Sequence, residues 1–392
     1  MISVEEAIQK VVKTVQTTTT SQTIRVREAV GEILSKDVIA PINMPPFRQS
    51  AMDGYALNLY DNTTYEVRDE VKAGDQHHPV LEKGEAVRIF TGAAVPDTAN
   101  TVIMQERVVM NENTIAVEGL VNFGDNIRLE GEQIKKGEIA LKKDTIITVA
   151  GIGYLLSLGI QEIQVYKKPS IGVVVTGNEL IEPGKPLSTG KVYDSNGGML
   201  ATALQSLEYK EISEYSVKDQ YETTKEVLLT ALKENDVIVL SGGISVGTYD
   251  YVGKALKELG VEEIFYKVKQ KPGKPLFFGR RKNKIVFALP GNPAAALSCF
   301  YLYVYPALEK LRGNKNFSLD KKEVTSISSF EKKGNRAQFL KAILEENTVT
   351  ILEGQSSAML QTFAVANALV YIPEERSRIM KNDTVEVICL PI

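Results

Sequence analysis

Three polar loops of the sequence combine glycines with side chains that bind anions or metal ions, and each loop follows a run of apolar residues. They are Thr176-Gly177-Asn178-Glu179, Ser241-Gly242-Gly243-Ile244-Ser245-Val246-Gly247 and Pro290-Gly291-Asn292-Pro293. Glycines let backbone N–H groups approach a phosphate closely, and hydroxyl groups add further donors. One such loop is as often an ordinary turn, but three at one edge of a parallel sheet would converge on a crevice. The sequence therefore predicts that these loops bind a phosphorylated ligand.

Acidic side chains accompany the loops. Glu179 ends the first loop, Asp250 follows the second, and Asp219 precedes a helix expected from Tyr221. Carboxylates beside phosphate-binding backbone are a typical way to hold Mg²⁺, which takes one or two of them together with phosphate oxygens of a substrate. Each acid also suits the first turn of a helix, where the helix dipole favours negative charge, and for Asp219 this alternative stays open. We predict a Mg²⁺ site formed by these three acids.

A run of basic residues lies between the second and third loops. Residues 267–284 contain no acid and include Lys267, Lys269, Lys271, Lys274, Arg280, Arg281, Lys282 and Lys284. Such a run is usually a solvated face, and a nucleic-acid patch is an alternative. However, the first three lysines alternate, so on a strand they would share one face, and the flanking Pro272 and Pro275 direct Lys274 rigidly. We predict that this cluster binds a phosphorylated or oxyanion substrate.

The elements that must position these residues alternate between residues 169 and 314. Apolar, mostly β-branched runs predict buried strands, and the segments between them predict helices. We expect strands at residues 171–175, 212–217, 237–240, 263–268, 276–278 and 284–289, and helices at residues 198–207, 221–233, 251–259 and 292–311. This alternation predicts an α/β domain with a doubly wound parallel sheet and ligands at the carboxyl ends of its strands.

The remaining sequence predicts β-rich structure. Residues 42–141 and 318–392 contain short strand-like runs separated by turn residues, and a capping box at Ser3 and Glu6 begins an N-terminal helix. A strand expected at residues 145–149 leads into Gly151-Ile152-Gly153, which imitates the start of a dinucleotide-binding motif. Because the third glycine position holds Leu156 and no ribose-binding acid follows, we expect a closely packed helix there and no NAD site.

Composition narrows the functional classes. The chain has 392 residues, of which 43% are hydrophobic and 24% charged, as in a soluble globular protein of two to four domains. A net charge of −3 argues against binding to nucleic acid or to an anionic membrane, and no apolar run is long enough to span a bilayer. Cys299 and Cys389 have no metal-like spacing, so we expect free thiols and a cytoplasmic location.

The sequence lacks the residues that two common kinds of catalytic site require. The sequence contains no Gly-x-x-x-x-Gly-Lys-Ser/Thr motif, which excludes a P-loop NTPase. The only histidines are the neighbours His77 and His78 beside Pro79, which argues against a histidine-based zinc site or a Ser-His-Asp hydrolase.

Eight motifs follow one another along nearly the whole chain. They are Pro45-Pro46-Phe47 leading to Ser50-Ala51-Met52-Asp53-Gly54-Tyr55-Ala56, Phe90-Thr91-Gly92-Ala93, Asn126-Ile127-Arg128, Thr176-Gly177-Asn178-Glu179-Leu180, Asp194-Ser195-Asn196, the Ser241 to Gly247 loop, Lys271-Pro272-Gly273-Lys274-Pro275 and Leu289-Pro290-Gly291-Asn292-Pro293. Together they resemble the molybdopterin molybdenumtransferase family, the MoeA family, which includes the E domain of gephyrin.

The resemblance implies four domains and an elongated homodimer. A discontinuous N-terminal domain would comprise residues 1–41 and 142–168, with a β-rich domain inserted at residues 42–141. A molybdopterin-binding domain at residues 169–314 and a C-terminal β-domain at residues 318–392 would follow. The implied reaction inserts molybdenum from molybdate into adenylylated molybdopterin, with Mg²⁺-dependent release of AMP. The implied partners are the pterin substrate, a second subunit and other molybdenum cofactor enzymes.

The resemblance also assigns roles to particular residues. Glu179, Asp219 and Asp250 would contact metal or nucleotide, and Lys267, Lys271 and Lys274 would contact phosphates or molybdate. Arg336 and Ser357 would join the oxyanion site, while Asp53 and Thr91 would reach in from the partner subunit. One position departs from the family pattern, because Gln133 stands where an aspartate is usual, and an amide cannot replace a carboxylate as a cation ligand.

Two other functions remain as alternatives. A molybdopterin adenylyltransferase shares a similar doubly wound domain and the Ser-Gly-Gly loop, although it would not need residues 1–168 and 318–392. A non-catalytic pterin-binding scaffold would keep the fold without turnover, although the presence of Asp53, Glu179, Asp250 and Lys271 argues against decay of the site.

Replacing Asp250 tests the predicted metal site. The Asp250→Asn change keeps the size of the side chain but removes its charge, so we expect it to abolish molybdenum insertion and to leave the fold intact. Activity is measured as molybdenum insertion, and folding by circular dichroism. Activity equal to that of the unchanged chain would refute the role assigned to Asp250.

Overall fold

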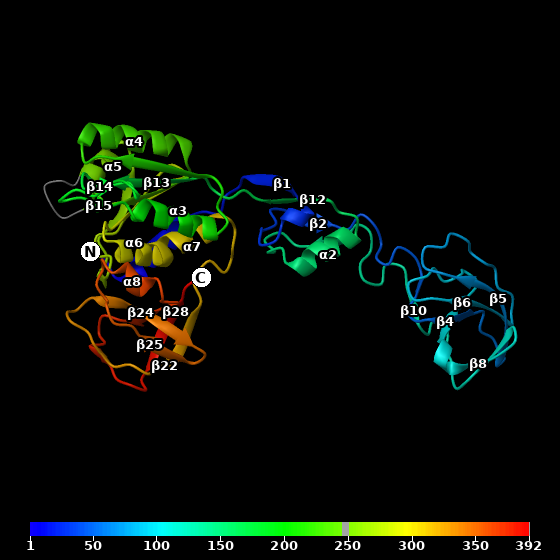
Figure 1. Cartoon of the computed structure of the whole chain (residues 1–392). Helices are drawn as coiled ribbons and strands as arrows, with labels where there is room; N and C mark the ends of the chain where they lie inside the picture. The colour runs from blue at the N-terminus through cyan, green and yellow to red at the C-terminus, as the bar shows by residue number, and fades with distance from the viewer. Residues whose placement is uncertain (245–250, 392) are drawn as a thin grey trace. The chain divides into compact units, whose positions relative to one another are not determined.

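The computed structural model describes residues 1–244 and 251–391. Ser245, Gly247 and Asp250, three of the predicted site residues, therefore lie outside the described residues. The chain divides into two compact units (Figure 1). The first unit comprises Met1–Ser21 and Tyr166–Ile392, and the second unit comprises Gln22–Val165. The finer division into four domains stays a prediction.

A six-stranded sheet forms the centre of the first unit, with strand order β16-β13-β17-β21-β20-β18. The strands are β13 (Ile171–Thr176), β16 (Ile212–Val217), β17 (Val237–Ser241), β18 (Glu262–Tyr266), β20 (Phe277–Arg281) and β21 (Lys284–Leu289). Four neighbouring strands run parallel, as predicted, and every residue of β13 and β17 is buried. β20 is antiparallel to both neighbours, because the short turn between β20 and β21 allows only a hairpin.

Helices cover both faces of this sheet, which confirms the doubly wound α/β class (Figure 1). On one face lie α1 (Val4–Thr14), α3 (Asn196–Ser206), α6 (Pro293–Cys299) and α7 (Tyr305–Leu311), and on the other lie α4 (Tyr221–Glu234) and α5 (Tyr251–Glu258). Successive side chains of β13 point to opposite faces of the sheet and so contribute to the hydrophobic core on each face. Val173 and Val175 face the first set of helices, and Val174 faces α4 and α5.

The single helix predicted at residues 292–311 is interrupted. Between α6 and α7, Phe300–Val304 adopt π-helical hydrogen bonding. Pro306, near the start of α7, has no backbone N–H to donate and its ring crowds the preceding turn, so a wider turn before it is expected. The interruption lies in the core, since Phe300, Tyr303 and Val304 are all fully buried.

The C-terminal part of the first unit closes into a small β-barrel. Its strands are β22 (Lys321–Ser326), β24 (Ala337–Glu345), β25 (Thr348–Ile351), β26 (Ala368–Ile372) and β28 (Thr384–Cys389), with β23 (Phe330–Glu331), β27 (Arg378–Ile379) and α8 (Leu360–Phe363) beside them. They pair in the order β24-β25-β22-β28-β26, and β26 pairs again with β24. β19 (Gln270–Lys271) adds to β24 from outside this ring. The predicted C-terminal β-structure is confirmed, and its closure removes open edges.

The second unit contains a six-stranded sheet with order β7-β4-β6-β5-β9-β8. Its strands are β4 (Gly54–Leu57), β5 (Thr64–Val71), β6 (Glu85–Ile89), β7 (Thr101–Met104), β8 (Val108–Asn111) and β9 (Thr114–Val117). Apolar clusters lie on both faces. A 3₁₀ turn at Gln105–Arg107 separates β7 from β8.

The second unit also contains the helix α2 (Val149–Ser157) and three short two-stranded pairs. These are β1 (Ser21–Arg25) paired to β12 (Glu162–Tyr166), β2 (Val38–Ile39) paired to β11 (Ile139–Leu141), and β3 (Gln49–Ser50) paired to β10 (Ile127–Arg128). The strand predicted at residues 145–149 is wrong. Ile146 makes only an isolated bridge with Ile33, and the Thr148 hydroxyl accepts the Gly151 N–H at 3.1 Å as the N-cap of α2.

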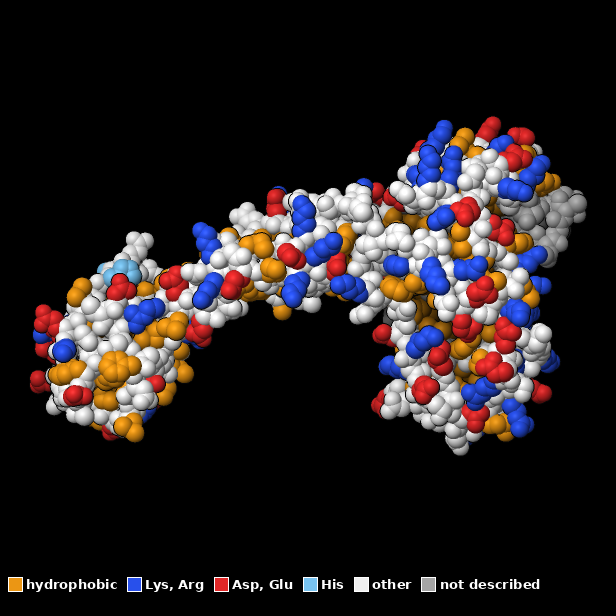
Figure 2. Space-filling model, turned by 180° about the vertical axis from the view of Figure 1, so that it is seen from behind, with side chains coloured by type: hydrophobic (Ala, Val, Ile, Leu, Met, Phe, Trp, Pro, Cys, Tyr) orange, Lys and Arg blue, Asp and Glu red, His pale blue; other side chains and the backbone are white. Residues whose placement is uncertain are grey.

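The surface agrees with the nearly balanced charge. On the face of the first unit seen in Figure 2, acidic and basic side chains are interspersed. Within residues 1–244 and 251–391, no helix has the length and apolar character that crossing a membrane requires.

Two glycines of the second unit should respond in opposite ways to alanine. A Cβ on Gly54 would lie 1.8 Å from the backbone oxygen of Ile103, so β4 and β7 would have to separate, whereas a Cβ on Gly153 in α2 would meet nothing within 4 Å. We expect Gly54→Ala to destabilise the second unit by about 3 kcal/mol or more, and Gly153→Ala to stabilise it by about 0.5–1 kcal/mol. Urea unfolding followed by circular dichroism measures both, and a stable Gly54→Ala protein would contradict the strand packing.

Candidate active site

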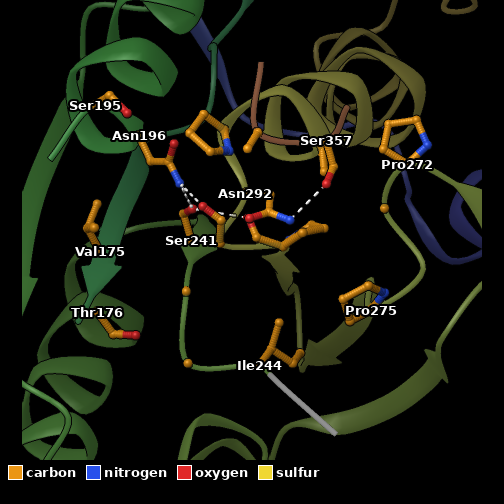
Figure 3. A pocket seen from close by; sticks show the side chains of 18 of the residues that line it. Val175, Thr176, Ser195, Asn196, Ser241, Ile244, Pro272, Pro275, Asn292 and Ser357 are labelled. Atoms are coloured by element: carbon orange, nitrogen blue, oxygen red, sulfur yellow. Dashed lines mark hydrogen bonds between the residues drawn. The ribbon is translucent and has the colours of Figure 1, made fainter. Parts of the chain in front are cut away.

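A cavity of about 810 Å³ opens at the carboxyl ends of the parallel strands of the first unit (Figure 3). All three predicted loops line it. Thr176 ends β13 and Glu179 follows it, Ser241 ends β17 and Gly242 to Ile244 follow it, and Pro290 to Pro293 lead from β21 into α6. Asp219, which follows β16, also lines the wall. The parallel register explains this convergence, because strands running in one direction end at one edge.

The two consecutive glycines after β17 allow a close approach between loops. Both have positive φ, 93° for Gly242 and 63° for Gly243. A Cβ on Gly242 would lie 2.4 Å from the backbone oxygen of Thr176, and one on Gly243 would lie 2.7 Å from the Thr176 hydroxyl. Larger residues would therefore push the second loop away from the first.

Asn196 joins two of the loops from the start of α3. Its Nδ2 donates to Ser241 Oγ at 2.8 Å and to the backbone oxygen of Gly291 at 2.8 Å (Figure 3). Its Oδ1 and the Thr176 hydroxyl are buried, and within the described part of the chain neither has a hydrogen-bond partner. Buried polar atoms are usually paired, so these two groups suit a ligand or water in the cavity. Asn196 belongs to the motif Asp194-Ser195-Asn196, but the sequence analysis assigned no role to it and expected the helix to begin only at residue 198.

The C-terminal barrel contributes the opposite wall. Arg336, Gln355 and Ser357 line the cavity together with Lys271 and Lys274. Ser357 is held in place by two contacts, because its hydroxyl accepts from Asn292 Nδ2 at 2.8 Å and its backbone oxygen accepts from the Ala295 N–H at 3.1 Å (Figure 3). Residues of the sheet and of the barrel are therefore connected directly at the cavity.

The loop that carries Ser357 rests on a buried lysine. Lys341 is 4% exposed, and its ammonium group donates to the backbone oxygens of Gly354, Ser356 and Met359 at 2.8, 3.2 and 3.0 Å. Burial lowers the pKa of this group. The three carbonyls compensate for part of the lost hydration, so Lys341 anchors the loop and is not itself part of the cavity wall.

The cavity carries both signs of charge. Its lining includes the acids Glu179, Asp194 and Asp219 and the cations Lys271, Lys274 and Arg336. The Asp219 carboxylate accepts from the Asn178 N–H at 3.3 Å, and Asn178 Oδ1 accepts from the Asp219 N–H at 3.1 Å. Among residues 1–244 and 251–391, no group of three or more His, Cys, Asp or Glu side chains could hold a metal ion. Glu179 and Asp219 still suit Mg²⁺, which needs only one or two carboxylates beside phosphate oxygens.

Among the described residues of the first unit, two predicted site residues do not line the cavity. Gly177 is next to it, and its N–H donates to the backbone oxygen of Val217 at 3.3 Å. Lys267 does not line the cavity, and its ammonium group lies 4.5 Å from the centre of the Tyr266 ring.

The predicted alternation of three lysines on one strand is wrong. β18 ends at Tyr266, and Lys267 has a φ of 70°, which turns the chain out of the strand. Lys269 contacts Glu374 at 3.7 Å, while Lys271 lies in β19 and faces the cavity. A left-handed residue at the strand end therefore separates side chains that the sequence pattern had placed together.

Asp53 and Thr91 meet in the second unit. The Asp53 carboxylate accepts the Thr91 N–H at 2.7 Å and the Thr91 hydroxyl at 2.8 Å. These two bonds, with the positive charge of Arg88, hold the pKa of Asp53 below its usual value. The exposed Gln133 is tied by its backbone, whose N–H donates to the oxygen of Met44 at 2.9 Å.

Three protein-family models match the chain in order. They are described as the MoeA N-terminal region (domain I and II) at residues 2–159, a probable molybdopterin binding domain at residues 172–310 and the MoeA C-terminal region (domain IV) at residues 324–390.

Named relatives match over the full length. The chain is 33% identical to the molybdopterin molybdenumtransferase of Haemophilus influenzae, covering 99% of this chain and 98% of that protein. It is 32% identical to the molybdopterin molybdenumtransferase of Staphylococcus epidermidis, covering 99% and 95%. A solved structure of the molybdopterin biosynthesis MoeA protein from Pyrococcus horikosii superposes with a TM-score of 0.86 at 30% identity, covering 99% of both chains.

Removing the Thr91 hydroxyl should raise the pKa of Asp53. The Thr91→Val change leaves the backbone N–H bond, so we expect the pKa to move toward the ordinary value of 3.8 without reaching it. Because the lowered pKa belongs to the folded state, both bonds stabilise the second unit above pH 3.8, and their contribution is lost as the pH falls through the lowered pKa. NMR titration of the Asp53 carboxyl measures the change. Thr114→Val, whose hydroxyl donates to a backbone oxygen, is the control; equal pKa values in all three proteins would contradict the assignment.

Proposed function

The chain belongs to the MoeA family of molybdopterin molybdenumtransferases, and we propose that it inserts molybdenum from molybdate into adenylylated molybdopterin and releases AMP. The observation that carries the proposal is the meeting of glycine-rich loops, carboxylates and cations at one cavity of about 810 Å³. Such a cavity offers backbone N–H groups and positive charge to a phosphoanhydride and to an oxyanion in the same place.

The oxyanion is best placed among Lys271, Lys274, Arg336 and Ser357. Molybdate is strongly hydrated, and three cations with a hydroxyl group replace that hydration when it enters the cavity. The two dithiolene sulfurs of the pterin then bind molybdenum, the oxygen that they displace leaves as water with the two thiol protons, and a water molecule hydrolyses the phosphoanhydride to release AMP. The residues of the chain are required to hold the two substrates together, and this positioning by itself accounts for a large part of such a rate enhancement.

The phosphoanhydride of the pterin substrate is best placed along the glycine loops. Gly242, Gly243 and Gly291 present backbone to the cavity without side chains, and the buried Thr176 hydroxyl and Asn196 Oδ1 provide polar groups that have no partner within residues 1–244 and 251–391. We assign Glu179, Asp219 and Asp250 as the residues that hold Mg²⁺. When bound, Mg²⁺ neutralises charge that develops on the pyrophosphate.

The active enzyme is proposed to be a homodimer in which Asp53 of the partner subunit and Thr91 of the partner subunit complete the cavity. The exposed apolar side chains of the second unit support association. Val149 and Leu156 of α2 are 75% and 37% exposed, and Val30 is 48% exposed. Val149 and Leu156 are seven positions apart and so lie on one face of α2, and an exposed apolar face is typical of surfaces that a second protein covers. A cytoplasmic location stays a prediction.

A single-turnover assay tests the function. Adenylylated molybdopterin is mixed with the protein and Mg²⁺, with and without molybdate, and AMP release is followed; tungstate replaces molybdate in a parallel series. We expect molybdate-dependent release of AMP. Release without molybdate would contradict the coupling, and no release with the pterin still bound would favour the scaffold. Formation of adenylylated pterin from ATP would favour the adenylyltransferase.

Two lysine variants locate the reaction in the cavity. Lys271→Ala removes a cation that lines it, and we expect AMP release to slow about a hundredfold. Lys282→Ala removes the same charge from the turn between β20 and β21, outside the cavity lining, and we expect a change within about twofold. Equal losses in both variants would contradict the assigned site.

A further inference from the structure

Gln270 is a fully buried polar residue directly behind the loop Lys271–Pro275 that lines the cavity. Its exposed fraction is 0%, which is rare for glutamine unless its amide is paired. It belongs to β19, the strand that joins the sheet domain to the C-terminal barrel through β24. None of the sequence motifs gives it a role.

The amide nitrogen of Gln270 faces the loop. Nε2 donates to the backbone oxygens of Pro272 at 3.1 Å and Gly273 at 3.4 Å. Because carbonyl oxygens only accept hydrogen bonds, the nitrogen and not the oxygen of the amide must point toward them. Oε1 then points the other way and accepts the hydroxyl of Tyr303, which is itself fully buried. The amide is therefore locked between the loop and the long helix.

The loop is packed against this amide without spare room. Gly273 has a φ of 86°, and a Cβ there would lie 2.4 Å from Cys299 Sγ and 2.8 Å from Gln270 Nε2. Cys299 is completely buried, and burial raises the pKa of its thiol to about 12, so it acts as packing and not as a nucleophile. Gln270 and Cys299 together therefore determine the distance between the loop Lys271–Pro275 and the helix that carries Cys299.

The backbone of Gln270 holds the third cation of the cavity. Its carbonyl oxygen accepts from Arg336 Nη1 at 3.0 Å, and its Cα pairs in register with Ala337. One residue thus contacts, through its side chain, the loop that carries Lys271 and Lys274 and, through its backbone, the side chain of Arg336. These three cations all line the cavity.

We propose that Gln270 is a positioning residue that sets the spacing of Lys271, Lys274 and Arg336 for a tetrahedral oxyanion. This rests on the proposed function. Lysine side chains are long and flexible, and binding loses less entropy if the backbone that carries them is already held in place. An oxyanion that meets three cations at once depends on their separation, so a small movement of the loop weakens binding even when all three charges remain.

Gln270→Met tests the proposal against Tyr303→Phe. Methionine keeps the length of the side chain but cannot donate to Pro272 and Gly273, whereas Tyr303→Phe removes a buried hydroxyl from the same network and leaves the amide bonds to the loop. The full-length proteins are titrated with molybdate by calorimetry, KM for molybdate and kcat are measured by AMP release, and thermal unfolding is recorded. Gln270→Asn, whose amide is one methylene too short to contact both sides, is a second variant if methionine prevents folding.

We expect Gln270→Met to weaken molybdate binding and to raise KM for molybdate about tenfold, with a smaller change in kcat, and Tyr303→Phe to stay within about twofold of the unchanged chain. A merely structural role would lower thermal stability in both variants and leave molybdate affinity alone. Equal affinity in folded Gln270→Met, or in Gln270→Asn, would overturn the proposal for Gln270 only. Absence of molybdate binding by the unchanged chain would overturn the proposed function as well.

Discussion

Parallel pairing of β13 with β17 is the constraint on which the cavity depends. In this register Val175 lies opposite Ser241, so both strands end at the same level and their loops leave the sheet side by side. The loop after β17 must then pass over Thr176, and the space available there excludes any side chain at Gly242. Every residue of both strands is buried. A shift of the pairing register would therefore move polar side chains from the loops into the core and would displace both loops.

The second requirement is the connection between the sheet and the barrel. β19 pairs with β24, which places Lys271 opposite Gln338, and the backbone oxygen of Gln270 accepts from Arg336. On the other side of the cavity, Asn292 bonds to Ser357, and Lys341 holds the Ser357 loop through three carbonyls. The barrel is therefore part of the cavity wall and not an appendage. Because the Lys341 side chain is buried, the geometry of its three hydrogen bonds is narrowly defined.

The cavity lining contains side chains of both charges. Lys271, Lys274 and Arg336 attract an anion, whereas Glu179, Asp194 and Asp219 attract a cation. A ligand that presents phosphates with a divalent metal at one end and an oxyanion at the other satisfies both sets of groups. Near neutrality of the lining also agrees with the interspersed charges of the surface (Figure 2).

The sequence by itself determined the order of the elements and the three loops at the sheet edge. These follow from short-range chemistry, since buried β-branched runs, helix caps and glycine turns are encoded within a few residues. Most of the predicted loop residues line the cavity for that reason. Two strand predictions were wrong, because a strand-like pattern does not reveal where a strand ends: Lys267 has a left-handed backbone that ends β18 early, and residues 145–149 form no strand, although the helix expected after them is present at Val149–Ser157.

Only the tertiary structure decided which distant residues meet. Gln270 and Arg336 are 66 positions apart and make contact because β19 joins β24, and Asn292 reaches Ser357 across 65 positions. In the sequence Gln270 is one polar residue among lysines, and only the fold shows that it lies between the loop and Tyr303. Local composition cannot encode such contacts, since they arise when separate cores pack against each other and leave particular polar atoms enclosed together.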